Sequence, residues 1–375
     1  MGETHPGVSR LRGSHSVALS ERQNYLRNAS FQGPEWVPCG VSISTASWLQ
    51  WREEMEEVVA RHPILFPRFR KGQRDFDSMD PGPAHRRGQR FTDAWGCVWR
   101  SEIDGLEGQV VRSPLADWEA FDSYVPPDPL VTGDRGPADW DGARKRVARA
   151  KKGGRLTWGS VPHGFLFMRL YYLRGFDNFM MDVAQDDPRL DRLCRMLLDH
   201  NLTIVNQWLE MGVDAISFGD DLGTQTASML GPKHFRRWIQ PGYEALFGPC
   251  RQAGVHVMLH SDGYIMDIMD DILASGVSII NPQDLCNGID HLAREVKGRV
   301  CIDLDVDRQT IVPFGTPQQI RELIEEEVRT LGSPEGGLEL ICGIYPPTSP
   351  ENVDAVCSAM EEFRTYWWDG RAASR

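Results

Sequence analysis

The stretch VHVMLHSDG at residues 255–263 starts as an apolar strand and ends abruptly in polar, metal-capable side chains. Four other stretches share this pattern: AISFGDD at 215–221, VSIINPQ at 277–283, VCIDLD at 300–305 and LELICG at 338–343. A segment of helical character follows each of them. Short apolar strands that alternate with helices indicate a parallel sheet, because parallel neighbours need a crossover connection. Polar groups at the ends of five strands predict an α/β fold of the (β/α)8 TIM-barrel class, with the active site on that face.

The overall composition argues against some classes of partner and indicates the cellular compartment of the protein. The net charge of -12 argues against nucleic acid as a partner, since phosphate binding needs clustered Lys and Arg. No apolar run approaches the roughly 20 residues that span a bilayer, so we expect no membrane partner. Residues 1–20 are polar and lack the apolar core of a signal peptide. Eight cysteines at irregular spacing indicate reduced thiols and a cytoplasmic protein.

The order of expected strands and helices predicts a single barrel domain at residues 21–368. We expect residues 1–20 to be disordered and residues 369–375 to form a short tail. Residues 65–135 are rich in Gly, Pro, Arg and aromatic side chains and contain a predicted hairpin. We interpret this insert as an elaboration that lies over the barrel mouth.

Three side chains form the sharpest candidate site. His260 and Asp262 lie two residues apart at a strand end, so they point the same way, because side chains alternate along a strand. Cys342 closes the strand that we place last, which in a closed barrel lies near the other C-terminal ends. Imidazole, carboxylate and thiolate all bind zinc, and three protein ligands leave a position open for substrate. The alternative is that His260 forms hydrogen bonds within the barrel mouth and Cys342 is a small buried residue.

Three carboxylates that follow strands are candidates for catalysis. Asp220 and Asp221 are adjacent, so they cannot both face the site from an extended backbone. One of them is expected to be structural. The other could bind a cationic group, complete a metal shell or move a proton, and the alternative for it is an N-cap of the following segment. Asp303 ends its strand and is expected to face the pocket.

Four further side chains are candidates for substrate binding: His163, Gln225, Asn281 and Gln283. The three amides cannot transfer protons, so they would orient a substrate or a metal ligand. His163 lies in a Pro-Gly loop, where a surface role is the alternative. The chain lacks the Walker A and dinucleotide-binding signatures, and the absence of G-x-S-x-G counts against a serine hydrolase.

The chain resembles the uroporphyrinogen decarboxylase superfamily at several points along its length. The matching segments are residues 21–38, 175–179 with 187–188, 220–225, 231–241, 260–263, 281–283 and 342–353. The resemblance covers about residues 20–368 and is most specific in the last 200 residues. It implies a (β/α)8 barrel, in agreement with the strand pattern.

The superfamily has two functional branches, and two sequence features distinguish them. The decarboxylase branch needs no cofactor and holds its tetrapyrrole through an arginine-rich segment after the first strand, but residues 41–46 contain no arginine and the next one is Arg52. The cobalamin-dependent methyltransferase branch binds zinc through His-x-Cys after one strand and a Cys after a later one. His260 and Cys342 match two of these positions, and Asp262 replaces the middle Cys. A carboxylate can bind zinc, although it is a harder ligand than a thiolate.

The resemblance therefore implies a zinc-dependent methyltransferase that exchanges a methyl group with a corrinoid protein or a small-molecule acceptor. One alternative is a cofactor-free, decarboxylase-like lyase that acts on a carboxylated substrate other than a tetrapyrrole. Another is a non-catalytic ligand-binding barrel. A methyltransferase of this kind would contain zinc, whereas a lyase would need a cationic pocket instead.

Overall fold

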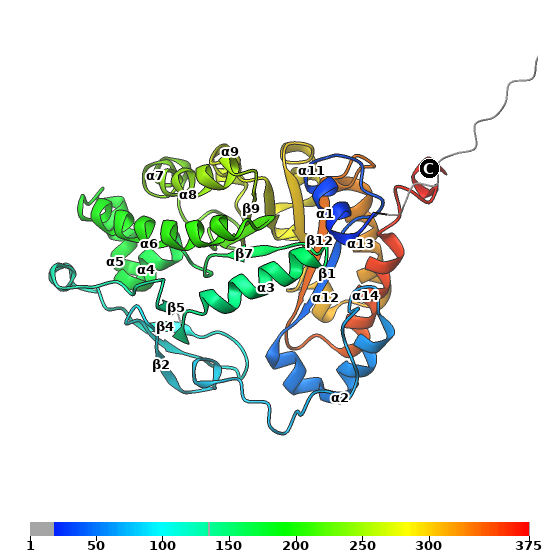
Figure 1. Cartoon of the computed structure of the whole chain (residues 1–375), viewed down its shortest axis with the longest axis horizontal. Coiled ribbons are helices and arrows are strands. Elements are labelled where there is room, and N and C mark those ends of the chain that lie inside the picture. The colour runs from blue at the N-terminus through cyan, green and yellow to red at the C-terminus, as the bar shows by residue number, and fades with distance from the viewer. Residues whose placement is uncertain (1–18, 134–135, 375) are drawn as a thin grey trace, which may run out of the picture.

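A computed structural model describes residues 19–133 and 136–374, and a curled sheet of seven parallel strands forms its centre (Figure 1). In sheet order the strands are β1 (Cys39–Ile43), β12 (Leu338–Ile344), β11 (Cys301–Asp305), β10 (Ile279–Pro282), β9 (His256–Ser261), β8 (Ala215–Gly219) and β7 (Trp158–Ser160). Every neighbouring pair is parallel. This arrangement confirms the predicted TIM-barrel-like α/β class. Apart from Leu19 and Ser20, the segment predicted to be disordered lies outside the described residues.

The two terminal strands of the sheet, β1 and β7, do not pair with each other in the described part of the chain. An eight-stranded barrel would place its second strand between them. The described chain between the helix after β1 and strand β7 instead contains the predicted insert. The sheet therefore has seven of the eight strands that the sequence pattern predicts.

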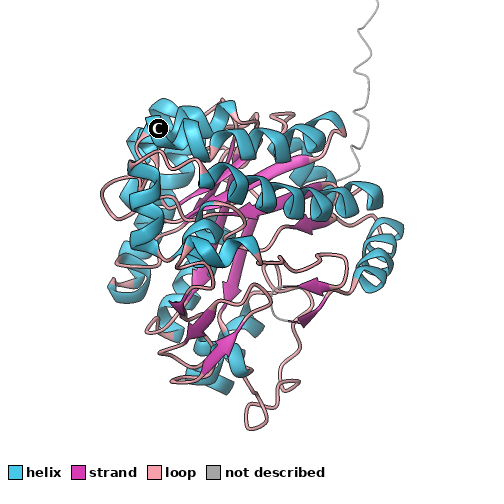
Figure 2. Ribbon diagram, turned by 90° about the vertical axis from the view of Figure 1, so that its left-hand side faces the viewer, coloured by secondary structure: helices cyan, strands magenta, loops and turns pink. Residues whose placement is uncertain are grey.

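Helices pack around the strands (Figure 2). The α-helices are α1 (Glu21–Ala29), α2 (Thr45–Arg61), α3 (Trp140–Lys152), α4 (Phe167–Arg174), α5 (Phe176–Ala184), α6 (Arg189–Met211), α7 (Pro232–Trp238), α8 (Gln240–Gln252), α9 (Met269–Ala274), α10 (Asp284–Asn287), α11 (Ile289–Glu295), α12 (Ile311–Phe314), α13 (Pro317–Leu331) and α14 (Pro350–Phe363). Within residues 19–133 and 136–374, 3-10 helices lie at Pro83–His85, Trp118–Asp122, Met266–Ile268 and Arg371–Ser374. Among the described residues, no helix has the length and apolar composition that crossing a membrane would require.

Local sequence signals explain where several helices begin and end. Ser20 and Gln23 form a capping box at the start of α1, and Thr316 and Gln319 form one at the start of α13. Each box satisfies backbone N–H groups that the first helical turn leaves unpaired. Helix α6 ends at Gly212, whose φ of 64° is left-handed and favours glycine.

Helix α1 closes the N-terminal end of the barrel. Arg22 forms an ion pair with Asp214, which precedes β8, at 2.6 Å. Tyr25 packs edge-to-face against Trp158 at the start of β7, with ring centroids 5.6 Å apart. The side-chain oxygen of Asn28 accepts a hydrogen bond from the backbone of Gly337, just before β12. These contacts join α1 to strands on both sides of the gap between β1 and β7.

The insert contains a three-stranded antiparallel sheet where a hairpin was predicted. Its strands are β2 (Arg90–Thr92), β3 (Val98–Arg100) and β4 (Gln109–Arg112), followed by a short pair, β5 (Thr132–Gly133) and β6 (Gly136–Pro137). Trp99 of β3 packs edge-to-face against Tyr172 of α4, with ring centroids 4.8 Å apart. The insert is thereby attached to the helices that follow β7.

Candidate metal centre at the ends of the strands

Five acidic and histidine side chains meet at the C-terminal ends of β7, β8, β9 and β11. We call them the His260 cluster: His163, Asp221, His260, Asp262 and Asp305. The Nε2 atom of His260 lies 3.1 Å from Oδ1 of Asp262 and 3.7 Å from Oδ1 of Asp221. The same Asp221 oxygen lies 3.3 Å from Nε2 of His163. His260 is therefore the centre of the cluster.

Two overlapping sets within the cluster have the donor spacing that a metal ion requires. One set is His163, Asp221 and His260, and the other is His260, Asp262 and Asp305. Within each set, one ligand atom per residue lies within 4.8 Å of the others. Imidazole nitrogen and carboxylate oxygen both bind zinc and other divalent first-row metals. Either set could hold a divalent cation, and His260 belongs to both.

The orientation of His260 is fixed by its neighbour on β10. Nδ1 of His260 donates to Oδ1 of Asn281 at 2.6 Å, and the amide nitrogen of Asn281 donates to the backbone carbonyl of Asp303. This leaves Nε2 directed at the carboxylates. Burial lowers the pKa of His260, but the hydrogen bond to Asp262 and the charges of Asp262, Asp221 and Asp305 outweigh burial and raise it to about 9. The imidazole is therefore held as a cation at neutral pH by the same acids that could share a metal with it.

His163 reaches the cluster because a glycine ends β8. A Cβ atom on Gly219 would lie 2.5 Å from Cδ2 of His163, so only glycine leaves room for the ring. Burial lowers the pKa of His163, but the hydrogen bond and charge of Asp221 raise it above its ordinary value. Burial likewise raises the pKa of Asp221, whereas the hydrogen bond from His163 and the charges of both histidines hold it below its usual range. His163 and Asp221 thus form a pair beside His260.

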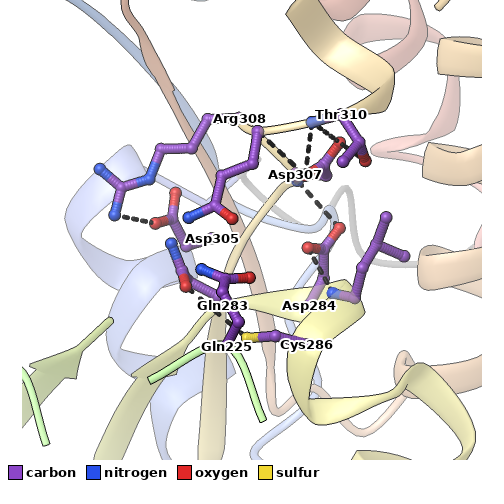
Figure 3. A pocket seen from close by; sticks show the side chains of 10 residues that line it. Gln225, Gln283, Asp284, Cys286, Asp305, Asp307, Arg308 and Thr310 are labelled. Carbon is purple, nitrogen blue, oxygen red and sulfur yellow. Dashed lines mark hydrogen bonds and ion pairs between the residues drawn. The ribbon is translucent and has the colours of Figure 1, made fainter. Parts of the chain in front are cut away.

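Arg308 is a site residue that the sequence analysis missed. Its guanidinium forms a close ion pair with Asp262. It forms a second one with Asp305 at 3.0 Å (Figure 3). It also lies over the ring of Tyr345, 5.4 Å from the centroid. Its only sequence signal is its position in the loop three residues after Asp305. Arg308 occupies both carboxylates that a metal at His260 would use.

A cavity of about 290 Å³ adjoins the cluster. Gln225, Gln283, Asp305 and Arg308 are among the residues that line it (Figure 3). Oε1 of Gln283 accepts a hydrogen bond from the backbone of Gly263 at 2.8 Å, which fixes the loop after Asp262. Of the four residues assigned to substrate binding, Gln225 and Gln283 therefore line the cavity, whereas Asn281 supports His260 and His163 joins the cluster.

Asp220 points away from the cluster. Its carboxylate is fully buried and accepts hydrogen bonds from the backbone of Phe167 at 2.6 Å and of Met168 at 2.8 Å, as well as from the hydroxyl of Tyr243 at 3.1 Å. The first two bonds satisfy N–H groups at the start of α4. Burial raises the pKa of Asp220 to about 6 against these hydrogen bonds. Of the two adjacent acids, Asp220 therefore supports the fold and Asp221 faces the site.

Asp303 lies on β11, two residues before Asp305 and on the same side of the strand. It is 7% exposed and borders a second cavity inside the barrel, away from the 290 Å³ cavity. Burial and the nearby charge of Asp305 raise its pKa to about 7, while His260 opposes the shift. Charged groups of the cluster therefore shift the pKa of Asp303, but Asp303 belongs to neither set of possible ligands.

Cys342 does not meet His260 and Asp262 in this structure. Glu339 of the same strand contacts Asn28 and Cys301, so its side chain faces the barrel interior. Cys342 is three residues further on, and alternation places it on the opposite face, toward the helices. It is fully buried, and burial raises the pKa of its thiol well above the ordinary value. Among the described residues, the side chain that forms a possible ligand set with His260 and Asp262 is Asp305 of β11.

A parallel barrel with a polar, metal-capable cluster at the C-terminal ends of its strands has the architecture of a barrel enzyme. The sequence places it within a family: residues 106–363 match the family described as Uroporphyrinogen decarboxylase (URO-D), and the chain belongs to that family.

The chain is similar to a curated relative and to solved structures. A protein named uroporphyrinogen decarboxylase from Thermus thermophilus is 26% identical over 178 residues, which cover 46% of this chain and 48% of that protein. The chain thus aligns with about half the length of this relative. A structure described as a methyltransferase from Methanosarcina mazei has a TM-score of 0.63 and 17% identity, with 91% of this chain and 98% of that chain covered. At this identity the likeness shows a shared fold.

Proposed function

We propose that this chain is a zinc-dependent methyltransferase that exchanges a methyl group with a corrinoid protein or a small-molecule acceptor. The observation that supports it most is the meeting of His260, Asp262 and Asp305 at the C-terminal ends of β9 and β11. The methyltransferase branch that the chain resembles binds zinc after the corresponding strand. The shared fold with a protein described as a methyltransferase supports the same reaction class.

The donor set fits a zinc ion. It offers one imidazole nitrogen and two carboxylate oxygens within 4.8 Å of one another, which leaves a position for substrate. The hydrogen bond from His260 to Asn281 is the outer support that metal-binding histidines usually have. We therefore assign Asp305 in place of Cys342 as the third protein ligand.

The roles of the protein residues follow from their positions. When bound, zinc would lower the pKa of an acceptor thiol or hydroxyl. Methyl transfer to such an acceptor releases its proton, and Oδ1 of Asp221 lies 3.7 Å from Nε2 of His260, where it could receive that proton. His163 would hold Asp221 in place. Gln225 and Gln283 would orient the acceptor in the 290 Å³ cavity.

Arg308 favours one second candidate, a cofactor-free lyase. The side chain of Arg308 lines the cavity and is 17% exposed there. The exposed part of its guanidinium could bind the carboxylate of a substrate. In that case Asp262 and Asp305 would position Arg308, and no metal would be required.

One set of assays on the full chain distinguishes the methyltransferase from the lyase. Zinc-loaded protein is incubated with methylcobalamin and a panel of small thiols, and loss of the methyl–cobalt absorbance is followed together with thioether formation. We expect turnover that chelation abolishes, zinc restores and His260→Ala eliminates. Asp270→Asn, an exposed carboxylate far from the cluster, is the matched control and should retain turnover.

The opposite result would replace the proposal with the lyase. Zinc-independent release of CO2 from a carboxylated substrate, lost in Arg308→Gln and kept in His260→Ala, would establish that reaction. Absence of methyl transfer by zinc-loaded protein across the thiol panel would count against the methyltransferase itself.

A further inference from the structure

The second cavity, which we call the interior chamber, lies inside the barrel and has a volume of about 470 Å³. Both edge strands of the sheet, which do not pair with each other, contribute to it, through Gly40 of β1 and Trp158 of β7. Glu21 and Ile64 also line it and are exposed, so the chamber reaches the surface. Its size falls within the roughly 300–1,000 Å³ of ordinary small-molecule sites. In the described part of the chain, no residue lines both this chamber and the cavity beside the His260 cluster.

One buried acid in the chamber lacks a partner. Asp303 is 7% exposed and lines the chamber, yet no hydrogen bond or ion pair reaches its carboxylate within residues 19–133 and 136–374. Its neighbour Glu339, by contrast, accepts a hydrogen bond from Asn28 at 3.4 Å. A carboxylate that faces a cavity and has no protein partner is available to hydrogen-bond or pair with a ligand. Asp303 is therefore the group in the chamber that a ligand would satisfy.

The remaining walls of the chamber indicate the chemistry of that ligand. Its charged residues are Glu21, Asp303, Glu339 and Arg364, so acids outnumber bases. The other side chains are largely apolar or aromatic, including Met258, Tyr25 and Trp158. Aromatic rings attract cations through their electron-rich faces. An acid without a partner, together with aromatic walls, matches a cation that carries an apolar body.

We propose that the interior chamber is a binding site for a small organic ammonium ion, which enters between β1 and β7 and places its nitrogen against the Asp303 carboxylate. The ligand's apolar portion lies against Trp158 and Met258. Binding requires no metal at the His260 cluster, because the two cavities have separate walls.

The test uses cyclohexylammonium as the probe, with cyclohexanol and cyclohexanecarboxylate as neutral and anionic relatives of similar size. Isothermal titration calorimetry of the full chain should show binding of the cation and weaker binding of both relatives. Asp303→Asn keeps the side-chain size and removes the charge, so the affinity for the cation should fall by about tenfold or more, which corresponds to about 1.4 kcal/mol.

A second variant tests the location independently of Asp303. No atom lies within 4 Å of the position of a Cβ on Gly40, so Gly40→Leu can fill the chamber without a backbone clash. Gly248→Leu, in α8 and equally uncrowded, is the matched control. Gly40→Leu should abolish binding and Gly248→Leu should retain it. Equal affinity for all three probes, no binding of the cation, or unchanged binding in Asp303→Asn would each overturn the proposal.

Discussion

His260 and Asn281 are joined by a hydrogen bond of 2.6 Å between Nδ1 of the imidazole and Oδ1 of the amide. Asn281 is in turn tied to the backbone of Asp303 on the next strand. The two bonds set the rotation of the His260 ring, and its Nε2 atom consequently faces Asp262 and Asp221. A neutral amide that cannot titrate thus determines which nitrogen of the ring is available to a metal.

Removal of this amide should weaken metal binding without unfolding the barrel. Asn281→Ala leaves Nδ1 of His260 without its acceptor, and we expect zinc affinity to fall by about 10–100-fold, as for other outer partners of metal-binding histidines. Competition with a chromophoric chelator measures this directly. Asn178→Ala, at an exposed amide on α5, is the control and should leave the affinity unchanged. An unaltered zinc affinity in Asn281→Ala would show that metal binding does not depend on the orientation of the His260 ring that Asn281 sets.

Arg308 should compete with a metal for its ligands. Its guanidinium already pairs with Asp262 and Asp305, so a cation at His260 has to displace it. In Arg308→Gln both carboxylates are released, and zinc affinity should rise by about tenfold. The same chelator competition provides the measurement. A weaker affinity in Arg308→Gln would mean that the arginine positions the two carboxylates for the metal and does not compete with it.

The two adjacent aspartates should differ in what their loss affects. Asp220→Ala removes three hydrogen bonds and leaves two buried N–H groups of α4 unpaired, so we expect the free energy of unfolding to fall by about 2–4 kcal/mol. Asp221→Ala should change stability much less and should reduce turnover. Urea denaturation together with the methyl-transfer assay distinguishes these effects. Similar stability losses in both variants would contradict the division of roles.

Acid should weaken the attachment of α1 to the barrel. Burial raises the pKa of Asp214, but hydrogen bonds from Arg22 and Thr157 outweigh burial and lower it below the ordinary value of 3.8. The unfolded chain therefore binds the proton more readily than the folded one. This contribution to stability is complete above the unfolded pKa and is lost as pH falls through the lower, folded value.

The effect is measured by urea denaturation of the wild type and Asp214→Asn at several values of pH. The wild type should be the more stable protein at pH 7, and the difference should shrink as pH falls below about 4. If the difference in the free energy of unfolding between the wild type and Asp214→Asn does not change with pH, the charge of the Asp214 carboxylate does not contribute to stability.

The two-residue period of a strand is enough to predict that His260 and Asp262 point the same way, because they lie two residues apart at the end of one strand. The same rule cannot place Cys342. Strand β12 is buried along almost its whole length, with apolar side chains on both faces besides Glu339, so its sequence does not reveal which side faces the interior. The contacts of Glu339 with α1 determine that side, and they depend on tertiary structure.

Other features lack a local signal altogether. Arg308 lies in a loop beyond β11, and only the path of that loop brings its guanidinium to Asp262, 46 residues away in the sequence. The gap between β1 and β7 arises because the insert occupies the part of the chain that a regular barrel would use for its second strand. The alternation of strands and helices predicts the barrel class but does not predict the gap between β1 and β7. The interior chamber, which both strands line, depends on that gap.

The assignment of the metal ligands is tested most directly by the zinc content of three proteins: wild type, Asp305→Asn and Cys342→Ser. Each is purified, loaded with zinc, dialysed and measured by elemental analysis, with thermal melts to confirm folding. We predict about one zinc per chain in the wild type and in Cys342→Ser, and a large loss in Asp305→Asn. Loss of zinc in Cys342→Ser with full retention in Asp305→Asn would contradict the account, as would absence of zinc from all three.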